Sequence, residues 1–121
     1  MDQSVVLLEK DAEVARSLAG WLCPHFAVHV AASHEEMRES VAQNHPEAVV
    51  VNIEHWGLTD VQSLRRDFPE LSIVCTHRVP DEEMWMAALE AGASDVCPSD
   101  DAGNVLASLL RSRALAHRAA A

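Results

Sequence analysis

The sequence contains no apolar run long enough to cross a membrane as a helix, and its first residues, MDQS, include no basic segment followed by an apolar core. We therefore expect neither a transmembrane segment nor a secretory signal. These two absences predict a cytoplasmic protein without a membrane partner.

Cysteine is scarce, and the spacing of Cys23, Cys75 and Cys97 fits neither a disulfide framework nor a metal site. We expect reduced, mostly buried thiols without a chemical role. The seven histidines also lack a metal-binding motif such as H-E-x-x-H. The sequence therefore predicts no metal and no cofactor.

Positive charge is scarce as well, because 9 lysines and arginines face 19 aspartates and glutamates, which gives a net charge of -10. Such a surface repels phosphate backbones and anionic lipid heads, which argues against nucleic acid or membrane as a direct partner. No repeat or low-complexity tract interrupts the chain. The length and composition of the chain predict one domain over residues 1–118, with residues 119–121 as a frayed end or the start of a linker.

What the chain does have is a regular alternation of apolar runs and amphipathic stretches. The apolar runs predict strands at residues 5–8, 26–30, 48–53, 71–75 and 95–97.

The amphipathic stretches predict helices between these strands. One begins near Asp11 with Val14, Leu18, Trp21 and Leu22 on its apolar face. Four more helices are expected. One follows a capping box formed by Ser33 and Glu36, and one covers residues 61–68. One ends at Gly92, and the last begins after the pair Asp100 and Asp101.

Strand-helix units with short connections predict a parallel sheet that is covered by helices on both faces. In such a sheet the functional loops lie at the carboxyl ends of the strands. These ends fall at residues 9–11, 52–57, 76–78 and 97–99.

Three blocks of sequence resemble the response-regulator receiver family, the CheY-like domains of two-component signalling. The blocks are "VVLLEKD" (residues 5–11), "PEAVVVNI" (46–53) and "ALEAGASDV" (88–96). The resemblance covers nearly the whole chain. It implies an α/β, flavodoxin-like, doubly wound sheet of five parallel strands in the order 2-1-3-4-5, with five helices.

The family's phosphorylation site falls on Glu9, Lys10, Asn52, Thr76 and Ser99 in this resemblance. Lys10 stands where the family has a second metal-binding acid, and an ammonium group repels Mg²⁺. Asn52 stands at the phosphoacceptor aspartate, and an amide oxygen is a poor nucleophile. Ser99 replaces the lysine that contacts a phosphoryl oxygen, whereas Thr76 is retained.

These departures predict a pseudo-receiver, which keeps the fold but has lost phosphorylation. We expect Lys10 to pair with Glu9, so that the pocket is charge-balanced without metal. The predicted function is that of a non-enzymatic module of signal transduction that contacts a protein partner or an attached output domain.

The resemblance also indicates where a partner would bind. Trp85, Met86 and Val96 border the surface that receivers use for dimerisation and output, formed by the helix that ends at Gly92, the strand at residues 95–97 and the last helix. An aromatic and a thioether side chain suit an interface anchor or homodimer contact, and they suit ordinary packing equally well.

Several alternatives remain open from the residues themselves. Asn52, Thr76 and Ser99 can bind a small neutral or anionic ligand in the vacated pocket. A receiver phosphorylated at an unconventional acid would use Asp11 or Glu54.

Two further alternatives involve histidine. Cys75 or Cys97 with His77 would form a thiol-imidazole pair for catalysis. His55 and His77 would meet Glu9 or Asp11 as a metal site or a pH sensor.

Overall fold

The computed structural model describes residues 3–120, with the side chains of residues 3–114. Five strands form one sheet. They are β1 (Ser4–Leu8), β2 (Ala27–Ala31), β3 (Ala48–Asn52), β4 (Ser72–His77) and β5 (Asp95–Pro98).

All neighbouring strands are parallel, and their order is β2-β1-β3-β4-β5. This order confirms the doubly wound, flavodoxin-like arrangement. Because the strands are parallel, their carboxyl ends meet at one edge of the sheet, which is where side chains from separate strands converge.

Within residues 3–120 there are six helices, one more than predicted. They are α1 (Ala12–Leu22), α2 (His34–Asn44), α3 (Ile53–Trp56), α4 (Thr59–Asp67), α5 (Glu82–Ala91) and α6 (Ala102–Ala120). The additional helix is α3, a single turn in the segment expected to be a loop. It forms because the Asn52 side chain accepts a hydrogen bond from the backbone N–H of Glu54 and so caps the turn.

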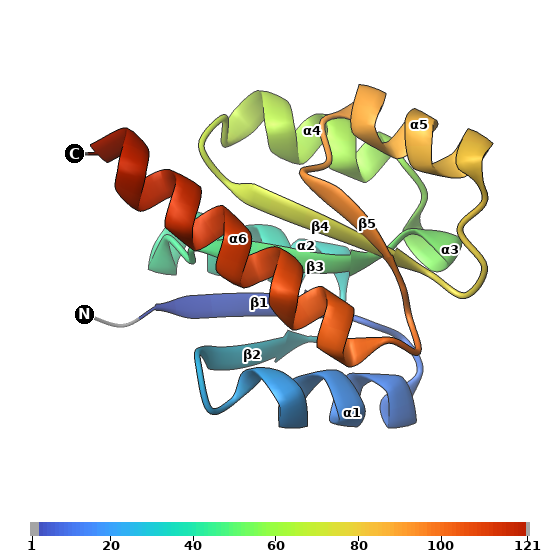
Figure 1. Ribbon diagram of the computed structural model, residues 1–121, viewed down its shortest axis with the longest axis horizontal. Helices are drawn as coiled ribbons and strands as arrows, with labels where there is room; N and C mark the ends of the chain where they lie inside the picture. The colour runs from blue at the N-terminus through green and yellow to red at the C-terminus, as the bar shows by residue number, and fades with distance from the viewer. Residues whose placement is uncertain (1–2, 121) are drawn as a thin grey trace.

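The helices cover both faces of the sheet (Figure 1). Side chains of α1 and α6, including Leu18 and Leu109, pack on one face. Side chains of α2, α4 and α5, including Met37 and Leu64, pack on the other. Leu7 and Leu8 are both fully buried because consecutive residues of a central strand face opposite helical layers.

The predicted helix ends are confirmed at several positions. The Asp11 side chain caps α1, and Ser33 accepts a hydrogen bond from the N–H of Glu36 at 3.1 Å at the start of α2. Gly92 ends α5 in the left-handed conformation, with φ 115°.

One expectation about burial is wrong. Trp21 is 53% exposed, because its ring lies across the surface at the start of α6, where a Cβ on Gly103 would be 3.6 Å from it. Two of the three thiols are buried, as expected: Cys75 lies in β4 and Cys97 in β5, whereas Cys23 follows the end of α1 and is exposed. No helix among the described residues is long and apolar enough to span a bilayer.

Candidate functional site

Four buried polar side chains gather at the carboxyl edge of the sheet, each from the end of a different strand. They are Glu9, Asn52, Thr76 and Ser99, with exposed fractions of 6%, 4%, 1% and 4%. Asn52 and Thr76 are register partners across β3 and β4, and Glu9, Asn52 and Ser99 line one cavity. The structure thus brings together four of the five residues that were predicted for the degenerate pocket.

Asn52 contacts the end of β1 and the start of α3 through the two ends of its side-chain amide group. Its Nδ2 donates a hydrogen bond to Oε1 of Glu9 at 2.8 Å, and its Oδ1 accepts one from the N–H of Glu54 at 2.9 Å. The second oxygen of Glu9 accepts a hydrogen bond from the N–H of Asp11 at 3.1 Å. A carboxylate only accepts hydrogen bonds, so an aspartate at position 52 would have no donor for Glu9.

The fifth predicted residue, Lys10, lies elsewhere. Its side chain is exposed, and within the part of the chain that the structure describes it forms no ion pair with Glu9. The predicted Lys10–Glu9 pair is therefore wrong. Consecutive residues at the end of a strand point in different directions, so Glu9 turns inward and Lys10 turns toward solvent beside α1.

A second pair of residues closes the outer side of this cavity. Glu54 accepts hydrogen bonds from the backbone N–H of Arg78 at 2.8 Å and from its Nε at 3.2 Å. The backbone hydrogen bond is the main cause that lowers the pKa of Glu54, and the guanidinium group adds to it. This contact joins α3 to the loop after β4.

The cavity at the carboxyl edge measures about 200 Å³. Sites for small molecules usually measure about 300–1,000 Å³ and present unpaired polar groups. Here the Glu9 oxygens, the Asn52 amide and the Glu54 carboxylate are already engaged with one another or with neighbouring donors. The arrangement is that of a closed polar network.

The two acids considered as unconventional acceptors, Asp11 and Glu54, also line this cavity. Asp11 Oδ1 accepts hydrogen bonds from the N–H groups of Glu13 and Val14 at 2.9 and 3.3 Å. Capping α1 in this way occupies one of the two carboxylate oxygens.

Within the described residues, the histidines near the edge are not grouped with further metal-binding side chains. His77 accepts a hydrogen bond on Nδ1 from the N–H of Val79 at 3.1 Å, and His55 lines the cavity from α3. Among the described residues, no cluster of three or more histidine, cysteine, aspartate or glutamate side chains is placed to hold a metal ion.

The two buried cysteines are poorly suited to act as nucleophiles. Burial raises the pKa of both Cys75 and Cys97 to about 12, so both thiols are protonated at neutral pH. This protonation argues against the thiol-imidazole pair with His77.

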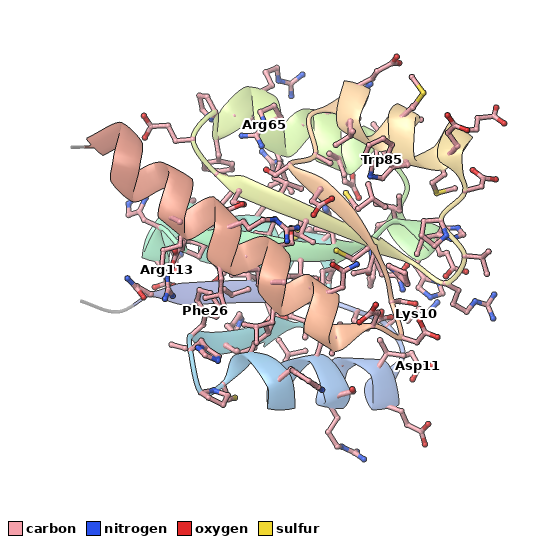
Figure 2. All side chains as sticks on the ribbon, in the orientation of Figure 1. Lys10, Asp11, Phe26, Arg65, Trp85 and Arg113 are labelled. Carbon is pink, nitrogen blue, oxygen red and sulfur yellow. The ribbon has the colours of Figure 1, made fainter. Side chains whose placement is uncertain are left out.

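The residues predicted for an interface lie on and near α5. Trp85 and Met86 are 44% and 52% exposed, and Figure 2 shows Trp85 on α5. Val96 is 8% exposed and belongs to the core under α5, so it offers little surface to a partner.

Sequence reasoning missed the role of Arg78, which holds Glu54 from 24 positions away in the chain. A long-range contact of this kind has no local spacing that would reveal it. The only signal is that both residues follow neighbouring strands, β3 and β4, which end at the same edge.

Solved receiver structures share this fold. The signal receiver domain of an HD domain-containing protein from Pseudomonas fluorescens Pf-5 matches with a TM-score of 0.84 at 15% identity, over 98% of this chain and 99% of that one. The BeF3-activated receiver domain of DrrB, described as a Thermotoga maritima OmpR/PhoB homologue, matches with a TM-score of 0.80 at 17% identity, over 93% of this chain and 97% of that one.

A longer protein matches over one part of its length. NtrX from Brucella abortus, solved in complex with ADP, matches with a TM-score of 0.81 at 18% identity, over 98% of this chain but 29% of NtrX. No protein-family model matches the sequence, and no curated protein matches it closely. These comparisons establish the fold that the sequence resemblance implied.

Proposed function

We propose that this chain is a receiver-type module of signal transduction that acts through protein-protein contact independently of phosphorylation, with Asn52 in place of a phosphoacceptor. The observation that carries the proposal is the hydrogen bond from Asn52 to Glu9, which fills the expected phosphoacceptor position with a neutral amide. The same bond engages the one acid that remains from the expected metal-binding pair.

Phosphoryl transfer to an aspartate needs a carboxylate nucleophile and cationic groups that stabilise the charge of the transferred group. Asn52 supplies no carboxylate, and Ser99 supplies no cation. Lys10 faces away from the cavity and cannot act as a Mg²⁺ ligand. Each of these changes weakens the reaction, and together they favour a role in binding.

The surface proposed for that role is the exposed face of α5. Trp85 and Met86 present large apolar groups to solvent there. Aromatic residues are enriched among the residues that dominate binding energy at protein interfaces. The occupant is a protein partner, an attached output domain or a second copy of the chain.

Intact-mass spectrometry tests the loss of phosphorylation. The protein is incubated with acetyl phosphate and Mg²⁺, and we expect no mass increase corresponding to a phosphoryl group. The positive control is the triple variant Lys10→Asp, Asn52→Asp, Ser99→Lys, which restores the expected acid, acceptor and cation. Circular dichroism verifies that this variant is folded.

A phosphoryl adduct on the unmodified chain would overturn the proposal. Peptide mapping would then distinguish Asp11 from Glu54 as the acceptor. An adduct on the triple variant alone would support the proposal, because it shows that the fold still permits the reaction once its groups are restored.

A further inference from the structure

Six of the eight lysine and arginine side chains that the structure describes are engaged within the protein. The exceptions are Lys10 and Arg16, whose side chains form neither an ion pair nor a hydrogen bond with another described residue. The side chain of Arg118 lies outside the described residues. The engaged cations bind carboxylates or backbone carbonyls and are Arg38, Arg65, Arg66, Arg78, Arg111 and Arg113.

Lys10 and Arg16 line the same groove, which measures about 590 Å³. It lies between α1, the end of β2 and α3. Ala15 and Ala19 form part of the α1 side, and their short side chains leave the space open. Val30, which is 46% exposed, and Trp56 from α3 add apolar surface. Figure 2 shows Lys10 beside Asp11, where β1 leads into α1.

The charge of the groove is opposite in sign to that of the chain. Two cations line it, and Glu9 is the only acid among its lining residues. Both oxygens of Glu9 accept hydrogen bonds from Asn52 and Asp11, which partly neutralise its charge toward the groove. The groove is therefore a local positive region in a chain of net charge -10.

We propose that this groove binds a small organic anion. The apolar body of the ligand lies against the alanines of α1 and the Trp56 side chain, and its anionic group lies between Lys10 and Arg16. The volume falls within the usual range of about 300–1,000 Å³ for small-molecule sites, and an apolar lining with a few polar groups is typical of them. Neither Lys10 nor Arg16 is paired with another described side chain, so both can form charge-assisted hydrogen bonds with the ligand.

This proposal is separate from the loss of phosphorylation. The groove shares Glu9 and His55 with the smaller cavity at the carboxyl edge, but its cations and its apolar surface belong to the β1–α1 connection, α1, β2 and α3. Binding of a ligand here does not depend on whether the chain is phosphorylated or whether a partner binds α5.

Two fluorescent probes test the proposal. The anionic probe is 8-anilino-1-naphthalenesulfonate, and the neutral control is N-phenyl-1-naphthylamine, which has the same aromatic framework without the sulfonate. We expect the anionic probe to bind saturably with a stoichiometry of one. The indole N–H resonance of Trp56 should shift during its titration.

The double variant Lys10→Gln, Arg16→Gln should bind the anionic probe about tenfold or more weakly, as loss of charge-assisted contacts implies. Its affinity for the neutral probe should be unchanged. A matched variant, Arg66→Gln, Arg111→Gln, removes the same charge from α4 and α6 and should leave both affinities unchanged.

Three results would overturn the proposal. They are binding that does not saturate, an equal loss of affinity in the two double variants, and anionic-probe binding that the Lys10 and Arg16 substitutions do not weaken. Circular dichroism of each variant excludes unfolding as the cause of a loss.

Discussion

Asn52 and Glu9 are 43 residues apart in the chain, yet the amide of one donates a 2.8 Å hydrogen bond to the carboxylate of the other in the interior of the protein. The bond joins the carboxyl ends of β1 and β3, which are neighbouring interior strands of the sheet. It gives the buried Glu9 carboxylate a hydrogen-bond donor. The stability of this edge should therefore depend on the amide.

Replacement of Asn52 by aspartate should lower the free energy of unfolding at neutral pH. The Asn52→Asp change places a second carboxylate against Glu9 and removes its donor, at a cost of about 1–3 kcal/mol. Repulsion raises the pKa of one of the two carboxyl groups. The destabilisation should therefore shrink as the pH falls below that raised value and one group is protonated.

Urea unfolding at several pH values measures this effect. Asn52→Ala is the control, because it loses the same hydrogen bond without adding a charge. Equal stability of the aspartate variant and the wild type at neutral pH would contradict the stabilising role of the Asn52–Glu9 bond.

The pKa of Glu54 should depend more on the backbone of Arg78 than on its side chain. The backbone N–H supplies the largest contribution that lowers this pKa. The Arg78→Gln change keeps that N–H, so Glu54 should still titrate below the ordinary glutamate value. Carbon-13 NMR of the side-chain carboxyl group measures the midpoint, and a return to the ordinary value would show that the guanidinium dominates.

The same contact makes a pH-dependent contribution to stability. Because folding lowers the pKa of Glu54, its contribution is present above the pKa of the unfolded chain and is lost as the pH falls through the folded value. Glu54→Gln should reduce this part of the pH dependence.

Cysteine alkylation should be confined to one site in the folded protein. Cys23 is exposed, whereas burial raises the pKa of Cys75 and Cys97 to about 12. Iodoacetamide at neutral pH should therefore add one adduct to the folded chain and three after unfolding in guanidinium. Cys23→Ser should show none when folded. Rapid labelling of Cys75 or Cys97 in the native state would reopen the thiol-based alternative.

The contrast between predicted and observed features follows from the range of the interactions. Asp11, Ser33 and Gly92 act on backbone groups a few positions away, so their roles at helix ends could be predicted from the sequence. The direction of Lys10 and the pairing of Glu54 with Arg78 depend on how separate strands end in space. Charge alone suggested that Lys10 would pair with Glu9, but the chain direction after β1 separates them.

The interface proposal makes a prediction for the oligomeric state. Trp85 on α5 and Trp21 on α1 are 44% and 53% exposed, and the two helices cover opposite faces of the sheet. If copies associate through α5, the Trp85→Ala change should shift light-scattering mass toward the monomer, whereas Trp21→Ala should not. Loss of an interface anchor costs about 2 kcal/mol or more, which is about a thirtyfold weaker association.

Measurements over a range of protein concentrations separate the outcomes. A concentration-dependent dimer that Trp85→Ala weakens and Trp21→Ala leaves intact would support self-association through α5. Equal weakening by both changes would place the contact elsewhere or make it nonspecific. A wild-type protein that stays monomeric throughout would exclude the second copy as occupant and leave a different protein as the proposed partner of α5, because burial of the exposed apolar side chains of Trp85 and Met86 is favourable.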